Sequence, residues 1–554
     1  MLFLIIEESV KMEKEEKKEE VQEEKVEPKK GPKKTGVILC IFVIVLLIVA
    51  IFALLFSKRG ENTTKKIKNN SKDYYSEYRM SGNSLEDFDL YFLQLENQKK
   101  NTIYSPLSIK YALEMLAEGA KGDTKAQLDA VIGDYKANKY PNNEHMSFAN
   151  AMFIRNTFKD SVLDSYTKTL TDKYGAEVIY DSFDNANTIN SWVDEKTLHL
   201  IKNLVKDDSV QSAQYYLVNA LAIDMQWNNL IQCEAGSRLT ACLRYHVNYA
   251  HEKYGDYVSV IYGESGYHGL EFDGKQNIKS LEIAASFNNY DIVKELGEDS
   301  IRKTVGDAYR DWLENDEDLK KSREYGYEPE EDVDKYLDQY IKEIDSNYGS
   351  EDTSSDYSLY VDDDVKVFAK DLQTYEGKTL QYVGIMPKEK ELQEFVKNTD
   401  SKTISKYIKN LKELKKENFK KGVVTQITGY IPVFEYEYEL DLMNDLKALG
   451  IEDVFDSEKS DLTNMTKTKG SYIFEAGHKA NIEFSNEGIR AAAATYMGGD
   501  GETSGGFDYL YDVPVEVIDI TFDHPYLYLV RDKDTGEVWF VGTVYEPTVR
   551  SVEG

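Results

Sequence analysis

The first ordered pattern of apolar residues along the chain is helical. In "SLEDFDLYFLQL", Phe88 and Phe92 recur at helical spacing, and the acidic residues before them suit a first turn. A second amphipathic run, residues 107–117, follows Ser105 and Pro106, which are typical of the cap and first position of a helix, and "EGAKGDT" ends it. The sequence therefore predicts helix, turn and helix at the start of a folded domain.

The longest apolar run precedes this domain. "GVILCIFVIVLLIVAIFALLF", residues 36–56, carries no charge and at about 1.5 Å per residue is long enough to cross about 30 Å of hydrocarbon. We expect a single transmembrane helix, because no small-residue cleavage site follows and the lysine-rich flanks do not suit a buried core helix. Lysines on both flanks leave its orientation open. We expect the Lys/Glu-mixed tail, residues 1–35, to be disordered and residues 57–83 to form a polar linker.

Charge and composition narrow the function classes. The net charge is −32 over 554 residues, and such a field opposes phosphate backbones, so nucleic acid is not an expected partner. Seven histidines and three cysteines without a CxxC pair argue against a metal site, and no cofactor is expected. Cys233 and Cys242 lie in "QCEAGSRLTACL" and form either a small disulfide loop or two buried free thiols.

Several motifs then follow one another in order. "NTIYSPLSIKYALEMLAEGAKGDT" is followed by "INSWVDEKTLHLI", "LVNALAIDMQW", "FAKDLQTYEGKTLQYVGIMPKE", "GHKANIEFSNEG" and "FDHPYLYLVRDKDTGEVWFVGTVYEP". In content, order and spacing these stretches resemble the serpins, the serine-protease-inhibitor family, over residues 84–232 and 365–549. The resemblance implies an α+β serpin fold of three β-sheets and about nine helices, with an exposed reactive-centre loop, preceded by the transmembrane helix.

The resemblance also implies roles for single residues. In serpins the main sheet opens at two regions, the breach and the shutter, and the matching positions are Asn101, Ser105, Ser108, Asn219, Trp227 and His478. Between the two matching parts, residues 233–364 exceed what the family needs. Their acidic composition and the helical spacing of Ile301, Val305 and Tyr309 predict a largely helical insertion. Whether it is a tolerated surface elaboration or a binding surface stays open.

The alanine-rich stretch "EGIRAAAATYMGG" lies where the family has the hinge of its reactive-centre loop, here about residues 487–515. The hinge and inserting residues are Glu487, Gly488, Ile489, Arg490, Ala491, Ala492, Ala493, Ala494 and Thr495. Side chains alternate along a strand, so Ile489, Ala491, Ala493 and Thr495 would form an uncharged inward face, and small alanines suit a strand that enters a sheet. The competing prediction, a short alanine helix, is weakened by the flanking glycines.

The bait bond depends on the length of the loop. The family's usual length places it at Glu502-Thr503, which would suit a protease that cleaves after glutamate, although Glu502 could equally be a solvated loop charge. The return segment is about 12 residues longer than the family's usual one, so cleavage after Phe507, Tyr509 or Leu510 is an alternative. These would suit a chymotrypsin-like or elastase-like enzyme.

Two functions follow from these features. The first is a membrane-anchored suicide inhibitor that traps a serine protease as an acyl-enzyme by inserting its cleaved loop. The second is a non-inhibitory serpin-fold binding or adhesion protein that uses the acidic insertion, favoured by Ile489, because inhibitory members usually have Thr or Ser there. We do not expect an enzyme, since no nucleophile, base and orienting group stand at a recognisable spacing. Because target proteases are mostly secreted, we expect the serpin domain to be extracellular.

Overall fold

The computed structural model describes residues 74–140, 142–227, 270–275, 278, 280–345, 357–485, 488–489, 507 and 509–547. All of them belong to one compact unit, residues 72–554. The predicted tail, the predicted transmembrane run and both cysteines of the predicted disulfide lie outside these residues.

The folded domain begins earlier than the sequence pattern indicates. Met80, inside the predicted polar linker, is fully buried. Its backbone N–H donates to Val131 O at 2.9 Å, and its carbonyl accepts from Asp134 N at 3.0 Å. A single apolar residue in a polar segment has no periodicity, so the sequence pattern gave no sign of this anchor.

One sheet has seven strands in the order β1-β17-β16-β9-β8-β7-β10. Its strands are β1 (Thr102–Tyr104), β7 (Tyr357–Val361), β8 (Val365–Asp371), β9 (Leu380–Pro387), β10 (Lys412–Glu413), β16 (Tyr526–Asp532) and β17 (Val538–Val544). The central strands are buried along nearly their whole length, as their continuous apolar runs predict.

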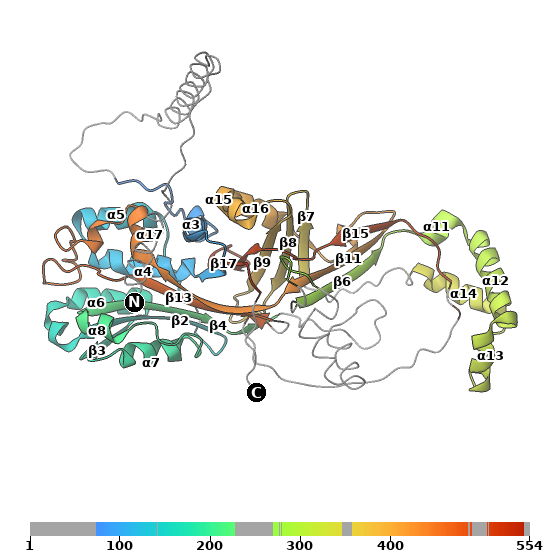
Figure 1. The fold of residues 1–554 in the computed structure, drawn as a ribbon, viewed down its shortest axis with the longest axis horizontal. Coiled ribbons are helices and arrows are strands. Elements are labelled where there is room, and N and C mark those ends of the chain that lie inside the picture. The colour runs from blue at the N-terminus through green and yellow to red at the C-terminus, as the bar shows by residue number, and fades with distance from the viewer. Residues whose placement is uncertain are drawn as a thin grey trace, which may run out of the picture. The chain divides into compact units, whose positions relative to one another are not determined.

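Two further sheets lie side by side, with β13 running alongside β4 and β2 (Figure 1). Their orders are β3-β2-β4 and β12-β13-β14-β5. The strands are β2 (Met146–Arg155), β3 (Glu177–Asp181), β4 (Tyr215–Ile223), β5 (Met225–Gln226), β12 (Phe434–Asp441), β13 (Gly477–Phe484) and β14 (Gly488–Ile489). Only Asp224 separates β4 from β5, so the two sheets are halves of one interrupted sheet. The expected three sheets are therefore four hydrogen-bonded sheets among the described residues, because the central position of this one is open.

The fourth sheet has the order β15-β11-β6. It consists of β6 (Ser280–Asn288), β11 (Val424–Pro432) and β15 (Val515–Asp519). Strand β15 runs parallel to β11, and β6 runs antiparallel to it. Both β6 and β7 come from the segment predicted as an insertion, so its two ends contribute strands to the sheets.

Nine α-helices of the described residues belong to the body that carries the sheets. They are α3 (Asp87–Glu96), α4 (Pro106–Gly119), α5 (Gly122–Ile132), α6 (Asp164–Tyr174), α7 (Asn187–Lys196), α8 (Asp207–Ser212), α15 (Leu392–Asn398), α16 (Ser401–Lys409) and α17 (Leu442–Ala448). Helix α4 begins as predicted, since Ser105 Oγ accepts from Ser108 N at 3.1 Å and Pro106 follows the cap. Helix α4 packs on β4 from one face of the interrupted sheet and α7 from the other (Figure 1).

Four more helices lie between β6 and β7. They are α11 (Ile292–Leu296), α12 (Glu298–Asn315), α13 (Glu317–Glu324) and α14 (Val333–Glu343). They have a small core of their own, formed by Ile292, Ile301, Val305, Leu337, Tyr340 and Ile344. We call residues 292–345 the inserted helices.

Candidate functional site

The interrupted sheet has a gap between β4 and β13. Strand β4 pairs with β2 on its outer side, and β13 pairs with β12 on its outer side. Among the described residues no backbone pairing joins β4 directly to β13. Two facing strand edges with unpaired N–H and C=O groups can accept another strand between them. We call this gap the slot.

The slot opens into a cavity of about 580 Å³. Its walls are residues 214–221 on the β4 side and residues 470–480 on the β13 side. Ser105, Ser108 and Ile109 of helix α4 and its cap also line it. Ala112, Leu113 and Leu116 further along α4 line it as well, so the slot runs between the strands and over helix α4.

The hinge occupies one end of the slot. Gly488 and Ile489 form the short strand β14, in which Ile489 lies opposite Met225 on one side and opposite Phe484 on the other. Ile489 is only 3% exposed and belongs to the main core. Its bulk is thus already accommodated between the two strands. Glu487 and the residues from Arg490 to Thr495 lie outside the described residues.

Trp227 closes the sheet next to the hinge. Its side chain is fully buried, and its Nε1 donates to Ser485 O at 2.9 Å. Its ring lies 5.5 Å from that of Phe484, and the Lys370 ammonium lies 5.7 Å from it. Trp227 thus holds the end of β13 directly before the hinge, where the resemblance places the breach.

Four of the predicted breach and shutter residues, Ser105, Ser108, Asn219 and His478, meet at the cavity wall. Ser105 N–H donates to His478 Nε2 at 2.9 Å, which requires a neutral imidazole. Burial lowers the pKa of His478 to about 4. On the opposite wall of the slot, Asn219 of β4 is bonded to the neighbouring strand β2, since its Nδ2 donates to Asn150 Oδ1 at 2.8 Å. His478 therefore ties β13 to α4, and Asn219 ties β4 to β2.

Asn101 does not join this group. Its Oδ1 accepts from Tyr545 N at 2.7 Å and Glu546 N at 2.8 Å, and its Nδ2 donates to Glu546 O at 2.6 Å. Asn101 lies just before β1 and fastens the chain that follows β17. Asn101 does not line the slot.

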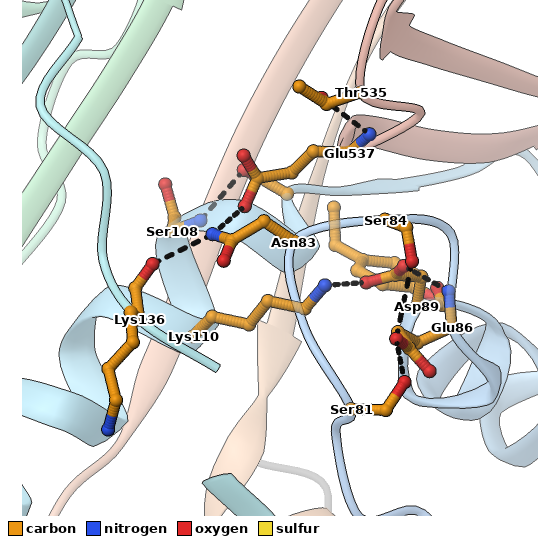
Figure 2. Close-up of polar contacts among 12 residues, drawn as sticks. Ser81, Asn83, Ser84, Glu86, Asp89, Ser108, Lys110, Lys136, Thr535 and Glu537 are labelled. Atoms are coloured by element: carbon orange, nitrogen blue, oxygen red, sulfur yellow. Dashed lines mark hydrogen bonds and ion pairs between the residues drawn. The ribbon is translucent and has the colours of Figure 1, made fainter. Parts of the chain in front are cut away.

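A buried ion pair, missed by the sequence analysis, lies on another side of α4. Lys110 Nζ lies 2.5 Å from Asp89 Oδ1, and both side chains are fully buried (Figure 2). Burial raises the pKa of Asp89 to about 6. In the same region Asn83 Nδ2 donates to Lys136 O at 2.8 Å and to Glu537 Oε1 at 3.1 Å. A lysine on the buried face of an amphipathic helix was the available signal. The cluster joins the start of the domain to the β16–β17 hairpin.

The candidate bait residues divide into two groups. Glu502 and Thr503 lie outside the described residues. Phe507 and Tyr509 are half-buried, whereas Leu510 is 56% exposed.

Other predicted sites concern the membrane and metals. Within the part of the chain that the structure describes, every helix is too short or too polar to span a bilayer; the predicted span, residues 36–56, lies outside it. The same described residues hold no group of three or more His, Cys, Asp or Glu side chains placed to bind a metal ion.

Comparison with known proteins agrees with this geometry. A family model described as "Serpin (serine protease inhibitor)" matches residues 87–238 and 321–547. Human leukocyte elastase inhibitor is 24% identical over 492 residues, covering 84% of this chain and 99% of that protein.

Two solved structures share the fold. The thermophilic serpin tengpin in its native state has a TM-score of 0.52 at 19% identity, covering 83% of this chain and 93% of that one. Thyroxine-binding globulin in complex with thyroxine has a TM-score of 0.51 at 18% identity, covering 83% and 97%. At such identities these similarities show the fold alone. The family model leaves residues 239–320, including α12, between its two matches.

Proposed function

Because the chain belongs to the serpin family, we propose that it inhibits serine proteases by inserting its cleaved reactive-centre loop into the slot between β4 and β13. The protease serine attacks the bait bond and forms an acyl-enzyme. The freed loop then adds as a strand before water releases the enzyme. The chain supplies the bait and the slot, and no catalytic residue.

The open slot with Ile489 seated at its end is the observation that carries this proposal. The register at Ile489 can be extended along both neighbours, since the hinge runs antiparallel to each. In the inserted state, Ala491 would then meet Ile482 and Ile223. Ala493 would lie between Ala480 and Leu221, which are 2% and 5% exposed.

The same register brings the polar residue of the loop to the polar part of the slot. In the inserted strand, Thr495 would fall level with His478 on β13 and Asn219 on β4. A small hydroxyl can donate and accept there, whereas an apolar side chain would leave buried polar groups without partners. The alternation of alanines followed by threonine therefore matches the walls of the slot level by level.

The length of the segment that would insert also suits the mechanism. About 15 residues at about 3.3 Å each give a strand of about 50 Å. This is far enough to carry a covalently attached protease to the other end of the sheet and distort it.

A pair of loop variants tests the proposal. Ala493→Arg would place an unpaired charge on the buried face of the slot, so we expect cleavage without a stable adduct. Ala492→Arg, on the opposite face that already carries Arg490, should retain the adduct. The assay incubates the full-length chain and both variants with glutamate-specific, elastase-like, chymotrypsin-like and trypsin-like proteases and looks for an SDS-stable complex.

The released fragment identifies the bait. We propose Glu502-Thr503, so N-terminal sequencing should begin at Thr503. If no protease gives an adduct and all cleave cleanly, inhibition is wrong, and the binding-protein alternative becomes the leading function.

We further propose that residues 36–56 anchor the protein in a membrane with the serpin domain outside the cell. The uncharged length of this run supports a membrane span. The secreted nature of most target proteases supports the orientation. Protease treatment of intact cells should release the domain; a domain that stays protected until the cells are lysed would contradict it.

A further inference from the structure

The inserted helices contact the chain that returns from the reactive-centre loop. Partly buried side chains pack on their small core from the stretch directly before β15: Phe507, Tyr509, Tyr511 and Val513. We call residues 507 and 509–513 the return arm. These contacts join parts of the chain that are about 170 residues apart, as the pair Tyr340 and Tyr509 shows.

The return arm lies on the helices as an extended segment. Exposure alternates along it: Tyr509, Tyr511 and Val513 are half-buried, whereas Leu510 and Asp512 between them are exposed. Such a period of two is that of a strand with one face covered. The arm continues into β15, which pairs with β11 from Val515 onward, so both its face and its end are fixed.

Phe507 is held by three aromatic rings of the inserted helices. Its ring centroid lies 5.0 Å from Tyr309, 5.5 Å from Trp312 and 5.8 Å from Tyr336. Tyr309 and Tyr336 are themselves stacked at 3.7 Å, joining α12 to α14. Edge-to-face and tilted pairs at these distances are attractive beyond the area they bury.

The backbone of the arm is held as well. Tyr340 Oη donates a hydrogen bond to Tyr509 O at 2.7 Å. This carbonyl belongs to the residue that would precede the scissile bond if a protease cut after Tyr509. A protease binds its substrate as an added strand and needs this part of the backbone for itself.

We propose that the inserted helices are a clamp that determines specificity, holding the return arm so that Phe507 and Tyr509 are withheld from protease active sites. The meaning of this clamp for inhibition rests on the proposed function. A chymotrypsin-like enzyme that cleaves after Phe507 must draw its ring out of the three-ring pocket. One that cleaves after Tyr509 must displace the Tyr340 hydroxyl. The clamp thereby keeps Phe507 and Tyr509 from competing with a bait bond before Phe507, although the side chain of Leu510, which follows them, is 56% exposed.

Two variants open the clamp in different ways. Trp312→Ala removes one wall around Phe507, and Tyr340→Phe keeps every ring but removes the hydrogen bond to Tyr509 O. Tyr325→Ala is the matched control, since Tyr325 is an inserted aromatic residue that is 92% exposed. The full-length chain and the three variants are digested with a low concentration of chymotrypsin, and the new N-termini are quantified over time.

We expect the wild type and Tyr325→Ala to be cut slowly after Phe507 and Tyr509. Cleavage after Phe507 should become at least about threefold faster in Trp312→Ala, and cleavage after Tyr509 similarly faster in Tyr340→Phe. Tyr340→Phe removes only a hydroxyl group and keeps the ring in its place. It therefore tests the clamp even if Trp312→Ala loosens the packing of the inserted helices. Equal rates at both sites in all four proteins would overturn the proposal, as would a wild type that chymotrypsin cuts first after Phe507.

The digestion experiment and the adduct assay can fail independently of each other. If no protease forms an adduct but the clamp variants gain these cuts, the clamp stands without the inhibitory function. If an adduct forms through cleavage after Phe507 or Tyr509, inhibition stands and the clamp is wrong.

Discussion

The hydrogen bond between Ser105 and His478, at the wall of the slot, makes the free energy of unfolding depend on pH. His478 Nε2 accepts the Ser105 N–H at 2.9 Å only while it is unprotonated. Burial lowers its pKa to about 4 from an ordinary value of 6.5. The folded state thus binds this proton less readily than the unfolded state, so the contribution is complete above pH 6.5 and is lost as the pH falls from there toward 4.

The size of the effect follows from the two pKa values. With 6.5 in the unfolded chain and about 4 in the folded one, the free energy of unfolding should fall by about 2 kcal/mol between pH 7 and pH 4.5 from this group alone. Asp89 and Asp445 act in the opposite sense in the same range, because burial raises the pKa of each to about 6. The pH dependence of the wild type alone therefore does not reveal the contribution of His478.

The contribution of His478 is obtained by comparing the wild type with a variant that lacks the titrating imidazole. Urea unfolding of the wild type and of His478→Gln is followed at both pH values, and the amide of glutamine, which can also accept from Ser105 N–H, does not titrate. The wild type should lose about 2 kcal/mol more than the variant on acidification. Equal losses in the two proteins would refute the assignment of a neutral, bonded His478.

Two buried contacts give further predictions. Lys110→Met should cost about 3 kcal/mol of unfolding free energy at pH 7, because it leaves Asp89 buried without its cation. The cost should be smaller at pH 5, because Asp89 of the wild type, with a pKa of about 6, is then protonated as well and the ion pair is lost in both proteins. Urea unfolding at the two pH values measures this. Trp227→Phe should lower the unfolding free energy by about 1 kcal/mol more than Trp539→Phe. Both indoles are fully buried, but among the described residues only Trp227 Nε1 has a hydrogen-bond acceptor.

Local signals in the sequence predicted local parts of the site. The cap at Ser105 fixes the start of α4 through atoms three residues apart. The strand alternation predicted that Ile489 faces inward, and its side chain is buried. The resemblance placed Trp227 and His478, whose partners lie more than 250 residues away. No periodicity could have supplied those partners, because they depend on how the strands are ordered in space.

The parts that were missed depend on contacts between distant segments. Residues 280–288 form β6 because β11 offers an edge to them, although the surrounding segment reads as helical and acidic. Asn101 lies in a serpin motif, but its side chain binds the backbone after β17, and only the position of Glu546 shows this. Likewise, the spacing of Val305 and Tyr309 predicted a helix, yet nothing local indicated that the rings of Tyr309 and Trp312 would face Phe507.

The two ends of the loop are held by different forces, and this gives cleavage a direction. At Ile489 the chain is held by strand pairing on both sides, which can extend residue by residue into the slot as more strand becomes free. At Phe507 and Tyr509 it is held by ring packing and one side-chain hydrogen bond, which have no repeating continuation. On the proposed mechanism, a cut between these points would release only the arm that can propagate, while the return arm would stay on the inserted helices and on β15. Insertion from the hinge would therefore meet no competition from the other end of the loop.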